Sequence, residues 1–306
     1  MATAALPGVT GDIEPLDRFL GRHHAVVVDV LPGAAPVTRR LLVGPADTPV
    51  VTHAVAVPTN GSEEPLATEE RVLRTVSALP GELSRSLPRT LGRVRVGPHQ
   101  AGLVLSAVPG LGRAAATGRP GLRPGQLLVA VSDWLGLVWR SSTNGDAPTL
   151  GSVALAAFLD RYGEATRLRT SPLLLQAARD RVAQVPVRGT LVHGCLCPRH
   201  TRFDAERVVG VDDWSLGSPA GNPLRDLGGF AARLAGPRLP EVIAGRTSYA
   251  GMYRQFLAGG LGRLGLPRSL WRDVLVLAQF EIAYAALGRG EADQMALLMA
   301  VLGGRR

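Results

Sequence analysis

The period of the apolar residues changes near Gly110, and this change constrains the fold more than any other feature of the chain. Before it, short runs of β-branched and aliphatic residues are separated by proline, glycine and aspartate turns, which is typical of strands. These runs cover residues 24–30, 40–43, 50–57 and 102–105. After Pro65 the apolar residues repeat at helical spacing, so one helix is expected within this strand-rich part.

Beyond Gly110 the pattern is mostly helical. Apolar residues repeat every three or four positions, and two short apolar strands interrupt them; the helical stretches are 128–138, 155–162, 173–185 and 271–285, and the strands are 190–192 and 208–211. This order predicts an α+β fold with two lobes. A small strand-rich N-terminal lobe is expected over residues 1–110, and a mostly helical C-terminal lobe over 111–306.

Composition limits the partners of the chain. Its 306 residues, 46% of them hydrophobic, are enough for two lobes with a buried core. All 34 basic residues are arginines, because the sequence has no lysine, and we take this bias as the mark of a GC-rich genome. The net charge of +9 favours anionic partners, but the arginines are scattered and not interleaved with aromatic residues. No nucleic acid is therefore expected as a partner.

The ends of the chain and its cysteines bear on localisation. The N-terminal segment lacks the basic and apolar regions of a signal peptide. The apolar stretch near the C-terminus is interrupted by Arg272 and Glu281, so no membrane partner is expected. Cys195 and Cys197 are too close in sequence for an unstrained disulfide, and two free thiols predict a cytoplasmic protein.

Four motifs follow one another along the chain. Val108-Pro109-Gly110 comes after the strand at 102–105, and His193-Gly194-Cys195 opens a loop that ends at His200. The last two are Val211-Asp212-Asp213-Trp214 and Asn222-Pro223-Leu224-Arg225-Asp226-Leu227. Together they resemble, over roughly residues 24–290, the aminoglycoside phosphotransferase family, whose loop reads H-G-D-x-x-x-x-N and whose metal-binding element reads I-D-W or I-D-F.

The resemblance implies a protein-kinase-like fold and a role for each motif position. In such enzymes the loop aspartate accepts the proton of the substrate hydroxyl, and the loop asparagine and a second aspartate bind magnesium. Here the first position is Cys195, the second is His200, and the second aspartate is retained as Asp213. A lysine on the third strand normally pairs with a helix glutamate and grips the nucleotide phosphates. Its position falls at or near Ala56.

These substitutions affect separate parts of the mechanism. A cysteine is mostly neutral at pH 7, an alanine gives no charge to the phosphates, and a histidine nitrogen suits magnesium poorly. Glu69 or Glu70 would be the helix glutamate left without a lysine, and the nearest phosphate-binding turn, 32–36, has prolines that lack amide donors. We therefore expect no phosphoryl transfer, no cofactor, and at best weak binding of a magnesium nucleotide.

Other motif residues have structural interpretations. The resemblance implies that His193 turns inward and that Asp226 braces the loop. Asp213 either binds the metal or, with Asp212, caps the turn that follows. Two alternatives concern the loop itself: a zinc site made by its two histidines and two cysteines, and a nucleophilic role for Cys195.

These residues predict a pseudokinase, a kinase-fold protein that binds an acidic peptide or protein partner instead of phosphorylating a substrate. Kinase-like proteins that resemble the family occur in bacterial natural-product pathways, where some act beside a lyase on ribosomal peptides; this is an analogy of fold. Two other functions stay open. One is an active phosphotransferase in which an arginine replaces the lysine and another acid replaces Cys195, and the other is a metal-stabilised structural module.

Overall fold

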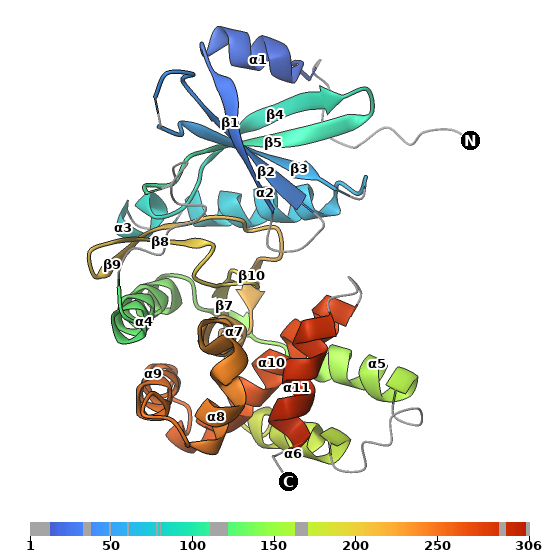
Figure 1. The fold of residues 1–306 in the computed structure, drawn as a ribbon, viewed down its shortest axis with the longest axis vertical. Coiled ribbons are helices and arrows are strands. Elements are labelled where there is room, and N and C mark those ends of the chain that lie inside the picture. Colours follow the sequence, from blue (N-terminus) through green and yellow to red (C-terminus); the bar gives the residue numbers. More distant parts are fainter. Residues whose placement is uncertain are drawn as a thin grey trace.

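The computed structural model has two lobes, one built on a sheet and one on helices (Figure 1). It describes residues 13–303 except 33–37, 49, 60, 78, 80, 111–121, 163–170 and 288–291. The predicted two-lobed α+β fold is confirmed. The lobe boundary expected at Gly110 borders the undescribed segment 111–121, and most of the turn at 32–36 also lies outside the described residues.

The N-terminal lobe is an antiparallel five-stranded sheet in the order β1-β2-β3-β5-β4. Its strands are β1 (Val26–Pro32), β2 (Thr38–Gly44), β3 (His53–Pro58), β4 (Thr90–Gly97) and β5 (Gln100–Ser106). Three helices accompany it: α1 (Leu16–Arg22), α2 (Glu64–Ser77) and α3 (Gly81–Arg85). Figure 1 shows α1 on one side of the sheet and α2 on the other, between the sheet and the helical lobe.

Both faces of the central strands are buried, because different helices cover them. Val43 and Val55 pack in one apolar cluster with Phe19 of α1. Ala54 and Ala56 point the other way and belong to the cluster that includes Leu66 of α2. The register between β2 and β3 sets Arg40 directly opposite Ala56. Cross-strand partners share a face, so the side chain of Arg40 is directed toward α2.

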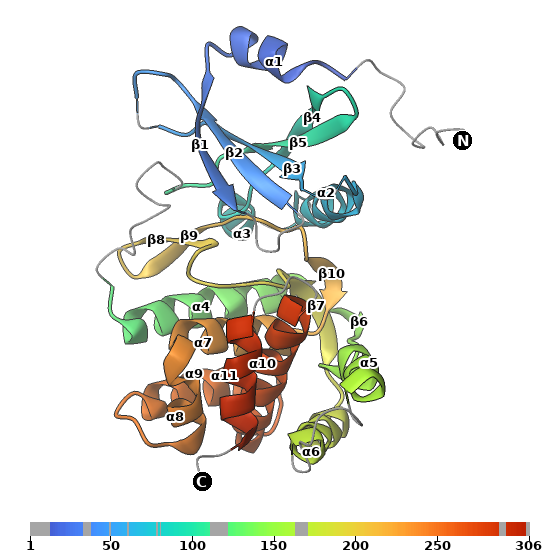
Figure 2. The ribbon, with the colours of Figure 1, turned by 45° about the vertical axis from the view of Figure 1, so that its right-hand side comes forward.

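The C-terminal lobe is mainly helical, with two small sheets at the side facing the N-terminal lobe (Figure 2). Its helices are α4 (Pro124–Ser141), α5 (Ser152–Tyr162), α6 (Ser171–Ala183), α7 (Leu224–Ala235), α8 (Leu239–Ala244), α9 (Ala250–Arg263), α10 (Trp271–Leu287) and α11 (Ala292–Gly303). Its strands are β6 (Asn144–Asp146), β7 (Arg188–Val192), β8 (Thr201–Asp204), β9 (Arg207–Val211) and β10 (Ser218–Gly221). In the described part of the chain no helix is both long and apolar enough to cross a bilayer.

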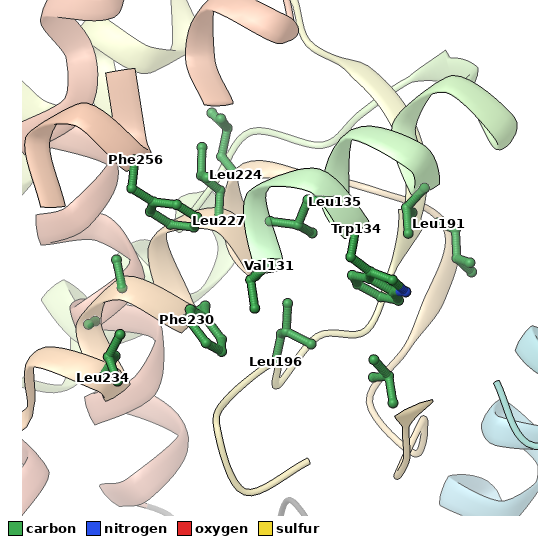
Figure 3. Packing of buried hydrophobic residues seen from close by; sticks show 14 of the residues in the cluster. Val131, Trp134, Leu135, Leu191, Leu196, Leu224, Leu227, Phe230, Leu234 and Phe256 are labelled. Carbon is green, nitrogen blue, oxygen red and sulfur yellow. The ribbon is translucent and has the colours of Figure 1, made fainter. Parts of the chain in front are cut away.

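The core of this lobe anchors the loop that follows β7. Val131 of α4 and Phe230 of α7 belong to one buried cluster, and Leu196 of the loop is part of it. Figure 3 shows the side chain of Leu196 directed toward these two helices. Cys195 and Cys197 are the neighbours of Leu196 in the sequence. Because the packing of Leu196 fixes the loop at this point, it also sets the positions of the two cysteines.

Candidate functional site

A cavity of about 180 Å³ lies between the lobes, with one apolar and one charged side. The sheet and the segments that flank its strands contribute Leu31, Leu42, Ala54, Pro88, Leu105, Ser106 and Val108. The charged residues are Arg40, which comes from β2, and Arg199, His200, Arg202, Asp212 and Asp213, which come from the loop after β7, from β8 and from the segment after β9. The cavity therefore combines Val108, from the Val108-Pro109-Gly110 motif, with residues of the loop and metal-binding motifs.

Arg40 of β2 pairs with the helix glutamate that a third-strand lysine would contact in the enzymes that the chain resembles. Its Nη2 donates to Glu69 Oε1 and Oε2 at 2.7 and 2.8 Å, and to Asp213 Oδ1 at 2.8 Å. The expectation that the helix glutamate lacks a cationic partner is thus wrong. A basic residue opposite Ala56 reaches the same face of the sheet from β2, so the cation is supplied by the neighbouring strand.

The geometry distinguishes between the two candidate helix glutamates. Glu69 is fully buried, and besides Arg40 it accepts a hydrogen bond from the backbone N–H of Trp214 at 2.9 Å. Glu70 lies on the outer side of α2 and pairs with Arg74 and Arg93. Glu69 is therefore the residue that joins α2 to the Asp213 segment across the lobes.

Asp213 is held by protein groups that compete with a metal. Its Oδ1 accepts hydrogen bonds from Arg40 and, at 2.7 Å, from Ser215 Oγ. Burial opposes ionisation of this carboxyl, but Arg40 and His200 hold its pKa well below the ordinary range. The bound guanidinium already neutralises this carboxylate, and a divalent cation placed beside it in a buried site would be repelled strongly. The residues present do not fit a magnesium ion.

The loop after β7 is braced by Asp226 of α7. Its carboxylate accepts the backbone N–H of His193 at 2.6 Å and that of Gly194 at 2.9 Å. Burial raises the pKa of Asp226 to about 6 despite these bonds. Gly194 has a φ of +82°, and a Cβ there would lie 2.0 Å from the carbonyl oxygen of Leu216, so only glycine fits.

His193 is fully buried and turned inward, where its ring links the loop to the Asp213 segment. Nε2 lies 2.7 Å from the carbonyl oxygen of Asp212, and Nδ1 lies 3.2 Å from the backbone N–H of Cys195. The second contact makes Nδ1 a hydrogen-bond acceptor. Nε2 therefore carries the ring proton and donates a hydrogen bond to the carbonyl oxygen of Asp212. Burial lowers the pKa of His193 to about 4, which agrees with a neutral ring.

Cys195 stands at the position of the proton-accepting aspartate and cannot replace it as a base. Burial raises the pKa of its thiol above the ordinary value, although Arg233 opposes this effect. The sulfur accepts a hydrogen bond from Arg233 Nη2 at 3.2 Å. A neutral thiol at neutral pH removes no proton from a hydroxyl group, whose pKa is far higher.

His200 stands at the position of the magnesium-binding asparagine and faces Asp212 and Cys197. Burial disfavours a positive charge on its ring, but Cys197 and Asp212 raise the pKa of His200 well above its ordinary value. Its Nδ1 lies 3.1 Å from Asp212 Oδ1. Burial would raise the pKa of Cys197, yet His200 lowers it to about 7. A protonated imidazole has no lone pair for a metal.

The alternative of a zinc site in this loop has no matching geometry in the described residues. Among the residues that the structure describes, no three of the histidine, cysteine, aspartate and glutamate side chains are placed to hold one metal ion. Cys195 and Cys197 are both buried free thiols. His193 and His200 are instead committed to Asp212.

Four arginines of the site were missed in the sequence: Arg40, Arg199, Arg202 and Arg233. Arg202 pairs with Asp212 Oδ2 at 2.6 Å, and its Nη1 donates to the carbonyl oxygen of Arg199. One signal was available for Arg40, because it stands inside an apolar strand of a chain that has no lysine. The sequence contains no comparable signal for Arg233, because its approach to Cys195 depends on how α7 packs against the loop.

Comparisons of sequence find no relative for this chain. No protein-family model matches it, and no curated protein matches it.

Comparisons of structure give extensive matches at low sequence identity. A thermostable mutant of aminoglycoside phosphotransferase APH(4)-Ia, in ternary complex with AMP-PNP and hygromycin B, matches with a TM-score of 0.60 and 14% identity over 94% of this chain and 99% of that one. The GDP and kanamycin complex of APH(2")-IIia gives 0.56 and 12%, over 91% and 93%. The apoenzyme of macrolide 2'-phosphotransferase MphH from Brachybacterium faecium gives 0.56 and 17%, over 94% and 97%. The chain thus has the protein-kinase-like fold of the aminoglycoside and macrolide phosphotransferases.

Proposed function

We propose that the chain is a pseudokinase, a binding protein that keeps the phosphotransferase fold and transfers no phosphoryl group. The observation that carries this proposal is the contact of Arg40 with both Glu69 and Asp213. Phosphoryl transfer in this fold depends on positioning the nucleotide and on magnesium neutralising its phosphates. With a guanidinium fixed on Asp213, the cleft lacks an open carboxylate for the metal.

The second candidate is an active phosphotransferase with substituted residues, and one observation favours it. Arg40 pairs with Glu69 as the missing lysine would have done. The enzyme would also need an acid in place of Cys195. The nearby carboxylates are already committed, Asp213 to Arg40 and Asp226 to two backbone N–H groups. The binding protein is therefore the better account of the site.

The partner that we propose is an acidic peptide or an acidic face of another protein. A net charge of +9 and the arginines of the cleft support this choice. The setting that we propose, a bacterial pathway that modifies ribosomal peptides, rests on the fold and on the arginine-only composition. Binding to such a partner should weaken as the salt concentration rises.

Magnesium nucleotides are expected to leave the melting temperature of the protein unchanged. A ligand at a hundred times its dissociation constant would add about 2.7 kcal/mol, which for a chain of this size is a shift of several degrees. Thermal melts with millimolar Mg-ATP or Mg-GTP, each matched by the same nucleotide in EDTA, measure this directly. A shift of several degrees that requires magnesium would contradict the proposal.

A further inference from the structure

We propose that the cavity binds the carboxylate or phosphate group of a small ligand that has an apolar body, and that it does so without a divalent metal. The inference goes beyond the proposed partner, because it concerns a small ligand in the cavity. It rests on the proposed pseudokinase function, because Arg40 must remain on Asp213 for the site to be metal-free.

Two buried arginines of the cavity have hydrogen-bond donors with no partner. The side chains of Arg40 and Arg202 are 6% and 7% exposed. Among the described residues, Nε and Nη1 of Arg40 and Nε of Arg202 bond to nothing. A buried donor left unsatisfied is costly, so such groups usually have a partner. An oxygen anion entering the cavity, with small shifts of these side chains, would supply it.

Arg199 gives the cavity a cation that is not already neutralised. Arg202 is paired with Asp212, and Arg40 with Glu69 and Asp213. Arg199 also lines the cavity, is exposed, and forms no ion pair with any described residue. A planar guanidinium binds carboxylate and phosphate groups through paired hydrogen bonds. The charged side of the cavity therefore suits an anionic head group.

The apolar side of the cavity determines the chemical character of the rest of the ligand. Leu42, Leu105 and Val108 line it with apolar surface, and Leu31 and Ala54 extend that surface. An apolar group placed there is removed from water and stabilises the complex. The volume of about 180 Å³ is below the range of pockets that enclose drug-sized ligands. A compact amphipathic anion fits these limits better than a nucleoside triphosphate does.

The test is calorimetric titration of the full chain at low salt in EDTA with benzoate, phenyl phosphate and the neutral benzyl alcohol. We expect both anions to bind and benzyl alcohol to bind at least about tenfold more weakly. Added salt should weaken the binding of the two anions and leave the binding of benzyl alcohol unchanged. Equal affinity for benzoate and benzyl alcohol would overturn the proposal. So would the absence of binding by both anions, or a requirement for magnesium. If only one of the two anions binds, it identifies the head group.

Arg199→Gln localises the anion, with Arg246→Gln as its matched control. Arg246 is exposed and follows α8 in the helical lobe. Arg199→Gln should lower the affinity for both anions about tenfold and leave the affinity for benzyl alcohol unchanged. Arg246→Gln should change none of these affinities. Equal affinities in both variants would refute the role of Arg199. The titrations contain EDTA and no nucleotide, so they test the anion site independently of catalysis. Turnover of Mg-ATP would contradict the proposed function, whereas the titrations alone decide whether the cavity binds an anion.

Discussion

Replacing Arg40 by methionine should lower the free energy of unfolding by about 3–5 kcal/mol, the usual cost of removing one partner from a buried ion pair. Glu69 and Asp213 are 0% and 1% exposed, so the variant would leave two carboxylates in the interior without their cation. Denaturation by urea measures the loss, provided the slope of the transition is unchanged.

Arg39→Met is the matched control, because Arg39 is the neighbouring residue on β2 and faces solvent. Its loss should stay within about 0.5 kcal/mol, as for other exposed positions. The double variant Arg40→Met, Glu69→Gln should recover part of the loss, since one uncompensated charge is then removed. Equal losses in Arg39→Met and Arg40→Met would contradict the central position given to this ion pair.

Asp226→Ala should cost about 2–6 kcal/mol, because two buried backbone N–H groups lose their acceptor and each such loss costs about 1–3 kcal/mol. Those groups belong to His193 and Gly194, at the start of the loop. The same urea experiment measures it.

Asp133→Ala is the control for this second variant. Asp133 lies on α4, is 69% exposed and pairs only at the surface with Arg263, so its removal should cost less than about 1 kcal/mol. Asp226→Asn, which keeps one acceptor oxygen, should fall between the two. A loss for Asp226→Ala no larger than that for Asp133→Ala would show that the loop does not depend on this brace.

The local patterns were enough to predict the two lobes and about half of their helices and strands; α7, α9 and α11 are among the helices that were not predicted. The strand β4 was not predicted, although Arg93-Val94-Arg95-Val96 alternates polar and apolar residues at the period of a strand. Val94 is buried and Arg95 is exposed, so this alternation was the signal that could have identified the edge strand.

The residues of the candidate site that belong to short sequence motifs were predicted. The motifs place His193, Asp213 and Asp226 near one loop, and in the structure they share one region with Asp212. That Arg40 is the cation was not predicted, because the family motif places the cation on β3 at Ala56 and not on the strand beside it. Which residue stands opposite Ala56 depends on the pairing register of β2 and β3, and this follows from turn geometry and packing.

The most direct test of the central claim is the turnover of Mg-ATP to ADP by the wild type and by Cys195→Asp, with Asp213→Asn as the control for contaminating enzymes. Hydrolysis needs no knowledge of the substrate. With Arg40 fixed on Asp213, restoring one carboxylate at residue 195 leaves the metal position closed. We therefore expect neither protein to exceed the control. Turnover by either one that is lost when Asp213 is also replaced by asparagine would show that the site still transfers phosphoryl groups.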